Sequence, residues 1–182
     1  MNSASFDPAL IRFRPLALAD LPLLHRWLNE PAVARWYGTG PDYATVEKKY
    51  APRIAGETPT APFLMLYGNQ PIGYIQTYRI ADYPAYARSI GAADDTGAWG
   101  IDMLIGEEAR RGRGLGAAAL RAFTQEVVFA QLGATACLID PHPENAVAIR
   151  AYQRAGYRFV RAIAADDSGE PVWLMRLARE AH

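Results

Sequence analysis

The chain has 182 residues, of which 51% are hydrophobic and 21% are charged, and its 19 basic and 19 acidic side chains leave no formal net charge. This composition predicts one soluble globular domain, and the absence of a basic excess argues against a nucleic-acid partner. No apolar run reaches the roughly 20 residues of a membrane-spanning helix, and the N-terminus lacks the charged and apolar regions of a secretory signal.

The first part of the chain predicts a strand followed by helices. Residues 11–16 (IRFRPL) alternate apolar and basic side chains, which is the pattern of a half-exposed strand. The ten or so residues before this strand are expected to be disordered. In residues 18–30, an apolar face behind Asp20, a candidate N-cap, predicts a helix. Two further helices are predicted at residues 31–38 and 43–56, and Pro52 limits the second.

The middle of the chain predicts a hairpin and a long loop. Residues 62–68 and 72–80 have strand-like sequences, and the turn signal GNQP joins them. Residues 81–98 are rich in Ala, Asp, Gly and Tyr and predict a loop. A loop of that length inside a compact domain is usually functional or disordered.

The second half of the chain alternates strands and helices. Strands are predicted at residues 99–105, 134–140, 157–163 and 172–178, and helices from the glycine-rich segment to about Leu132 and at residues 145–156. Cys137 is the single cysteine and has no partner for an internal disulfide, which favours a reducing cytoplasm. The order of elements predicts one domain over residues 1–182, of mixed α/β (α+β) class.

The segment EEARRGRGLGAAAL, residues 107–120, admits three interpretations. The first interpretation is a solvated loop. The second is a Rossmann fingerprint, because Gly112, Gly114 and Ala117 match G-x-G-x-x-G/A and Asp140 closes the next strand. Against the fingerprint, GEEARR separates the strand from the glycines, and a hairpin precedes the unit. The third interpretation is a phosphate cradle, because glycines let backbone N–H groups curl towards an anion at a helix N-terminus.

Residues 111–116 (RGRGLG) have the form R-G-x-G-x-G/A between a strand and a helix. They resemble the acetyl-CoA pyrophosphate loop of the GNAT superfamily of N-acetyltransferases. The resemblance implies a central mixed, mostly antiparallel sheet flanked by helices, with acetyl-CoA as co-substrate. The family's arginine falls on Arg111. The loop amides fall on Arg111, Gly112, Arg113, Gly114, Leu115, Gly116 and Ala117.

A second segment, residues 140–157 (DPHPENAVAIRAYQRAGY), is similar to a later part of the same superfamily. Asn145 matches an asparagine that contacts the pantetheine arm of the coenzyme, and Tyr152 matches a tyrosine that protonates the departing thiolate. Without the resemblance, Asn145 is an ordinary helix N-cap and Tyr152 a core aromatic residue. The glycine loop at the family spacing favours the functional interpretation of both.

Asp102 is the candidate general base. Acetyl transfer requires a neutral amine, and a nearby carboxylate can orient the ammonium and accept its proton. A charge in the apolar strand WGIDMLI is costly unless it is used or faces solvent. In the superfamily this strand also supplies backbone amides to the thioester carbonyl, and by that resemblance the amides near Met103 and Leu104 are expected to do so.

The chain resembles one branch of the superfamily, the aminoglycoside 6′-N-acetyltransferases, from about Trp27 to Tyr157. By this resemblance the catalytic acid falls on Asp102 and the substrate-binding aromatic region on Trp36 and Tyr37, which are otherwise core contacts at a helix end. The matching segments are WLNEPAVARWYG, YGNQPIGYIQTY, WGIDMLI and DPHPENAVAIRAYQRAGY.

The branch has a further acid in its substrate loop. The nearest counterpart of that acid is Asp82, although residues 81–98 differ in sequence from the family's loop. A polycationic antibiotic as substrate would require an acidic cleft with aromatic walls. The acids expected to line it are Asp82, Asp94, Asp95 and Asp102, although Asp94 and Asp95 also suit a plain exposed loop.

Other acceptors and roles remain open from the sequence. The same scaffold serves N-acylation of siderophore precursors and acetylation of ribosomal-protein N-termini. A non-catalytic acyl-CoA sensor is a further alternative, but it predicts loss of the acid or the tyrosine. His25, His142 and His182 are not spaced as metal ligands, so no metal is expected. The predicted partners are acetyl-CoA and a small amine, with no nucleic acid or membrane, for a monomer or homodimer conferring antibiotic resistance.

Overall fold

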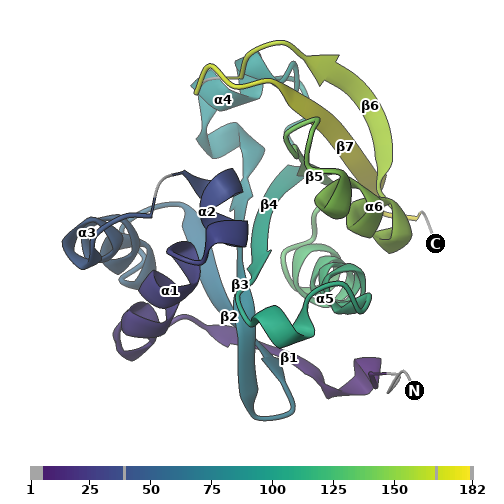
Figure 1. The fold of residues 1–182 in the computed structure, drawn as a ribbon. Coiled ribbons are helices and arrows are strands. Elements are labelled where there is room, and N and C mark those ends of the chain that lie inside the picture. Colours follow the sequence, from purple (N-terminus) through teal and green to yellow (C-terminus); the bar gives the residue numbers. More distant parts are fainter. Residues whose placement is uncertain (1–5, 39, 167, 181–182) are drawn as a thin grey trace.

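A computed structural model describes residues 6–38, 40–166 and 168–180. Within them, seven strands form one sheet in the order β1-β2-β3-β4-β5-β7-β6 (Figure 1). The pair β4/β5 is parallel and every other pair is antiparallel, which confirms the predicted mostly antiparallel sheet. The strands are β1 Ile11–Pro15, β2 Thr60–Tyr67, β3 Gln70–Arg79, β4 Ala98–Ile105, β5 Ala136–Ile139, β6 Arg158–Ile163 and β7 Val172–Ala178.

Helices cover both faces of the sheet. The predicted apolar face of α1 is buried, with Leu21, Leu24 and Leu28 against Tyr74 and Leu104 of the sheet. On the opposite face, α5 packs its alanine- and leucine-rich side on β1 and β4, and α6 packs beside it. The helices are α1 Leu21–Leu28, α2 Pro31–Tyr37, α3 Tyr43–Ile54, α4 Pro84–Ser89, α5 Leu115–Phe123, which continues as a π-helix over Thr124–Gln131, and α6 Ala146–Ala155.

The segment predicted as a loop at residues 81–98 contains helical structure. A 3-10 turn, Ile80–Asp82, leads into α4, which begins at Pro84, where the missing N–H of proline costs nothing. Ala87 and Ile90 are buried against Leu138 of β5 and its neighbours. A helix of six residues is too short to show a helical period in the sequence, which is why the segment was predicted to be irregular.

Two other boundaries differ from expectation. Helix α3 runs through Pro52 and ends at Ile54, close enough to its end that few hydrogen bonds are lost. Of the residues expected to be disordered at the N-terminus, Pro8–Leu10 form a 3-10 turn and residues 1–5 lie outside the described residues. No helix in the described part of the chain has both the length and the apolar character to cross a bilayer.

Candidate active site

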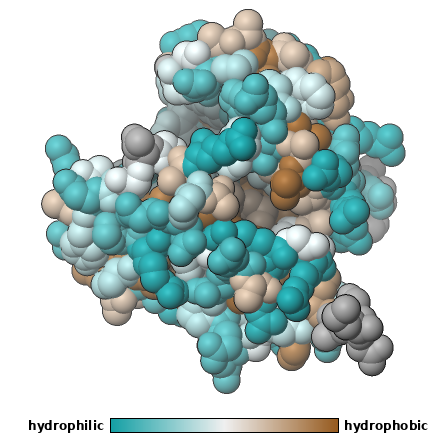
Figure 2. Space-filling model, viewed as in Figure 1, coloured by the Kyte–Doolittle hydropathy of each residue, from teal (hydrophilic) through white to brown (hydrophobic). Residues whose placement is uncertain are grey.

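The strands β4 and β5 separate after a short parallel pairing. Only Ala98–Gly100 of β4 pair with β5, whereas β4 stays bonded to β3 up to Ile105. The half of β4 from Ile101 onwards therefore has one backbone edge without a strand partner among the described residues. In Figure 2 a hollow with an apolar floor opens at this place, between α2 and α6. Met103 and Leu104, predicted to bind the thioester carbonyl, lie on this free half of β4.

The predicted phosphate loop follows directly from the end of β4. Gly112 and Gly114 have φ angles of 74° and 83°, which only glycine adopts without strain, so the backbone curls there before α5 begins at Leu115. A Cβ added at Gly112 would meet no atom within 4 Å, so the space beside Gly112 is open. The first N–H groups of α5, from Leu115 to Ala117, have no partner inside the helix and carry its positive dipole end.

Arg111 has a different role in the loop from the one its charge suggests. Its guanidinium donates to the carbonyl oxygens of Ile105 at 2.9 Å and Gly106 at 2.7 Å. The side chain thereby fastens the loop to the end of β4 and fixes the direction of the loop amides. Arg113 is exposed, and Gly116 lies in the first turn of α5.

Asp102 is held by a residue that the sequence reasoning missed. Gln76 lies opposite Asp102 across the β3/β4 ladder, and its Nε2 donates to Asp102 Oδ2 at 2.5 Å. Gln76 Oε1 accepts hydrogen bonds from the Tyr74 hydroxyl and from Arg53 of α3, each at 2.5 Å. These two donors fix the orientation of the amide. The signal was available in GYIQTY, where a glutamine stands between strand tyrosines, but its partner depends on the register of β3 on β4.

The pKa of the Asp102 carboxyl lies above its ordinary value. Burial is the main cause, because it disfavours the charged form. The hydrogen bond from Gln76 and the positive charges of Arg53 and Lys49 oppose that shift but do not cancel it. A half-buried carboxylate with a raised pKa is a stronger proton acceptor than an ordinary aspartate.

Two tyrosines lie close to Asp102. Burial raises the pKa of Tyr152 on α6, and the charges of Asp102 and Asp140 raise it further. Burial also raises the pKa of Tyr37 at the end of α2, followed by the effects of Asp102 and Tyr152. Both phenols are therefore neutral and able to donate a proton. The structure brings together Asp102, Tyr152 and Tyr37, which were predicted from widely separated segments.

A second carboxyl, Asp140, lies at the end of β5 on the same side of the sheet. Burial and the nearby charge of Asp102 raise the pKa of Asp140 to about 7, and the Tyr86 hydroxyl of α4 donates to its Oδ2 at 2.8 Å. The ring of Tyr78 lies against Tyr86 and covers Gly100, where an added Cβ would come within 2.5 Å of that ring. The sequence analysis considered Asp140 only as a dinucleotide-binding acid.

The other predicted site residues are distributed around this cluster. The ring of Trp36 lies 5.7 Å from that of His142, which follows β5. Asn145 caps α6 by accepting the N–H of Ala148 at 3.1 Å. Asp82 is exposed on its 3-10 turn, and no side-chain bond joins it to Asp102 in the described part of the chain. Asp94 is exposed too, and Asp95 pairs with Arg176 at 3.3 Å.

Within the described part of the chain, His25 and His142 do not form a cluster with other metal-binding side chains. His25 Nε2 lies 3.1 Å from the carbonyl of Pro41, and His142 lies against Trp36. His182 lies outside the described residues. Within them, no group of three or more His, Cys, Asp or Glu side chains could hold a metal ion.

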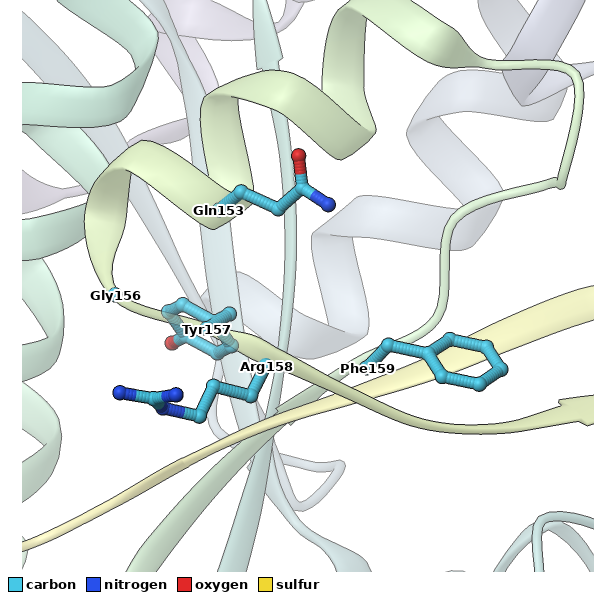
Figure 3. A pocket seen from close by; sticks show the side chains of 5 residues that line it. All are labelled: Gln153, Gly156, Tyr157, Arg158 and Phe159. Atoms are coloured by element: carbon cyan, nitrogen blue, oxygen red, sulfur yellow. The ribbon is translucent and has the colours of Figure 1, made fainter.

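Two surface pockets lie elsewhere on the molecule. One, of about 500 Å³, is formed where α6 ends and β6 begins, with Gln153 reaching from the helix and Arg158 and Phe159 pointing to opposite sides (Figure 3). Another, of about 240 Å³, lies beside Arg53 and the start of β2. Neither lining includes Asp102 or Tyr152. The candidate active site is therefore assigned from its chemistry and from the hollow beside β4.

The chain is similar to known acetyltransferases over most of its length. A family model described as an acetyltransferase (GNAT) domain matches residues 17–165. An aminoglycoside N(6′)-acetyltransferase type 1 from Klebsiella pneumoniae is 29% identical over 176 residues, which are 91% of this chain and 82% of that protein. The crystal structure of the aminoglycoside acetyltransferase AAC(6′)-Ib with coenzyme A has a TM-score of 0.83 at 29% identity, covering 93% of this chain and 95% of that one. The crystal structure of the same enzyme with coenzyme A and kanamycin has a TM-score of 0.82 at 29% identity, again covering 93% of this chain and 95% of that one.

Proposed function

The chain belongs to the GNAT family of acetyltransferases, and from that premise we propose that it acetylates the 6′-amine of aminoglycoside antibiotics. The observation that carries the proposal is the position of Asp102 and Tyr152 together beside the free half of β4. The similar proteins named for aminoglycoside acetylation, and the complex with coenzyme A and kanamycin, supply the acceptor class.

Acetyl-CoA fits the site as co-substrate. The open backbone after Gly114 and the N-terminus of α5 would bind its pyrophosphate. Asn145 would contact the pantetheine arm, which would run beside the free edge of β4. The backbone N–H groups near Met103 and Leu104 would then bind the thioester carbonyl oxygen and stabilise the negative charge that develops on it.

The reaction follows from the two titratable groups. Asp102 accepts a proton from the substrate ammonium, and the freed amine attacks the thioester carbon, forming a C–N bond. The tetrahedral intermediate then collapses and breaks the C–S bond. The neutral Tyr152 hydroxyl donates its proton to the departing thiolate, which leaves as free coenzyme A, and the acetylated nitrogen loses its second proton, which restores the Tyr152 hydroxyl. Trp36 and Tyr37, on α2 at the edge of the hollow, are expected to contact the sugar rings of the acceptor, and Asp82 is expected to reach the acceptor from the segment before α4.

A thiol-release assay tests the proposal. The purified protein is mixed with acetyl-CoA and kanamycin, ribostamycin or N-hydroxylysine, and the acetylated position is identified by mass spectrometry and NMR. Aminoglycoside-dependent thiol release with a 6′-acetylated product supports the proposal. Because no metal is expected to take part, a chelator should leave the rate of thiol release unchanged. Release only with N-hydroxylysine would favour the siderophore alternative. Coenzyme binding without release for any amine would favour the sensor.

Resistance is the expected consequence in cells. Acetylation removes a positive charge from the antibiotic, and it requires acetyl-CoA, so the protein is expected to act in the cytoplasm. The buried free thiol of Cys137 is compatible with that compartment. Expression in a susceptible bacterium should raise the inhibitory concentration of kanamycin, and expression of the Asp102→Asn variant should not.

A further inference from the structure

Two cations of α3 are fixed on one side of the candidate active site. Lys49 and Arg53 are one helical turn apart, with the Lys49 ammonium 5.5 Å and the Arg53 guanidinium 5.2 Å from the centre of the Tyr50 ring. Tyr50 is buried and makes an edge-to-face contact with Tyr74 of β3, at 5.4 Å between ring centres. The Tyr50 ring therefore positions both cations on the α3 side of the sheet, with Lys49 exposed and Arg53 half-buried.

Both cations act on Asp102. Arg53 donates to Gln76, which in turn donates to the Asp102 carboxylate. The charges of Arg53 and Lys49 each lower the pKa of Asp102 against the effect of burial, so both lie within electrostatic reach of the carboxylate. Partial burial and the neighbouring Arg53 lower the pKa of Lys49 in turn. Asp102 therefore has a positively charged flank on its α3 side.

The acids that would offset this flank are not gathered beside it. Asp140 has a pKa of about 7 and accepts a hydrogen bond from Tyr86, so it carries only part of a charge near neutrality. Asp95 pairs with Arg176, and Asp82 and Asp94 are exposed. Around Asp102 the structure therefore has a mixed site, in which two cations of α3 lie on one side of a half-buried carboxylate.

We propose that Lys49 and Arg53 form a charge filter that determines acceptor specificity, excluding a second ammonium group from the α3 side of Asp102. This inference rests on the proposed function. The amine to be acetylated reaches Asp102, while the part of the acceptor against α3 carries hydroxyl groups. Acceptors that would place an additional amine there are disfavoured by like-charge repulsion, a form of discrimination that needs no new attractive contact.

Lys49 gives the cleaner test, because Arg53 also orients Gln76. The measured quantity is the ratio of kcat/KM for kanamycin, which has several amines, to kcat/KM for 6-amino-6-deoxyglucose, which has one. In Lys49→Gln this ratio should rise about three- to tenfold at low salt, the size expected for one screened charge pair. The increase should shrink in high salt, because salt screens the repulsion between the Lys49 ammonium and an additional ammonium group of the acceptor. Lys48→Gln, the same change at an exposed neighbour on α3, should leave the ratio unchanged.

Arg53→Gln should raise the same ratio, even if it lowers both rates by loosening Gln76, because the loss of orientation affects both acceptors alike. An unchanged or lowered ratio in Lys49→Gln, or an equal rise in Lys48→Gln, would overturn the filter. Failure of the proposed function has a different signature. If the unmodified protein acetylates the single-amine sugar but no aminoglycoside, that function is wrong, and the filter still stands if Lys49→Gln enables transfer to kanamycin.

Discussion

The two halves of the candidate active site are built in different ways. The coenzyme side is made of backbone from one continuous segment, with the glycine loop and the first turn of α5 following directly on β4. The acceptor side is made of side chains from separate elements, including Gln76 of β3, Asp102 of β4, Arg53 of α3 and Tyr152 of α6.

This difference has a physical basis. A pyrophosphate is the same in every acetyl-CoA, and backbone N–H groups bind it whatever the surrounding side chains are. An acceptor amine must be oriented and deprotonated, which requires a carboxylate of suitable pKa held by neighbours. Substitutions should therefore separate the two halves. Changes on the acceptor side should alter turnover and acceptor selectivity, whereas changes in the loop should alter coenzyme affinity.

The largest effect is expected for Asp102→Asn. The substitution keeps the shape but removes the charge and the proton acceptor, so kcat/KM for kanamycin should fall by about 10²-fold or more, through both KM and kcat. Affinity for acetyl-CoA, measured by calorimetry, should stay the same because its pyrophosphate binds elsewhere. A variant with near-normal acetylation would show that another residue is the base, and a variant that lost coenzyme affinity would contradict the separation of the two halves.

Tyr152→Phe should reduce kcat by about 10²-fold, at the lower end of general acid contributions. The ring stays in place and only the hydroxyl is lost, so KM for kanamycin and coenzyme affinity should change little. Single-turnover kinetics would isolate the chemical step. Full turnover under those conditions would make Tyr152 a packing residue and leave protonation of the thiolate to water.

Gly114→Val should weaken acetyl-CoA binding by about tenfold. Gly114 has a φ of 83°, so a β-branched residue strains the loop whose backbone amides would bind the pyrophosphate. Gly133→Val is the matched control, because Gly133 has a φ of 70° in the turn before β5, where an added Cβ meets no atom within 4 Å. Both variants should lose similar stability in thermal unfolding. Equal coenzyme affinity in the two variants would refute the assignment of the cradle.

The smallest effect is expected for Gln76→Leu, and it depends on pH. The hydrogen bond from Gln76 lowers the pKa of Asp102, so its loss should raise that pKa further above the ordinary value. The carboxylate is the active form and exists above its pKa, so the acidic limb of kcat/KM should move to higher pH. The variant should lose several-fold in rate on the acidic limb of the profile and much less on its alkaline side.

Gln153→Leu, at an exposed position of α6 beside the surface pocket, serves as the control for that profile. Its acidic limb should coincide with that of the unmodified protein. If the limb of Gln76→Leu coincided with it as well, Gln76 would have no influence on the protonation of Asp102.

Local sequence was sufficient for much of the fold and for the backbone shape of the proposed coenzyme side. The strand and helix order was predictable because each long element carries its own periodicity, as Leu21, Leu24 and Leu28 do in α1. The glycine loop was recognisable because only glycine tolerates the φ angles at Gly112 and Gly114, so the backbone shape is determined by adjacent residues. The same segment carried the resemblance to acetyltransferases, and the family match agrees with it.

Only the tertiary structure determined the surroundings of Asp102. Gln76 and Asp102 are 26 positions apart, and Tyr86 and Asp140 are 54 apart, so these pairs exist only through strand register and the packing of α4. The positively charged flank depends on α3 packing beside β2, from where the Arg53 side chain reaches Gln76 of β3. A chain of amino acids specifies its own local backbone shape, but burial and the distance between charges, which set the pKa of Asp102, arise only when distant segments meet.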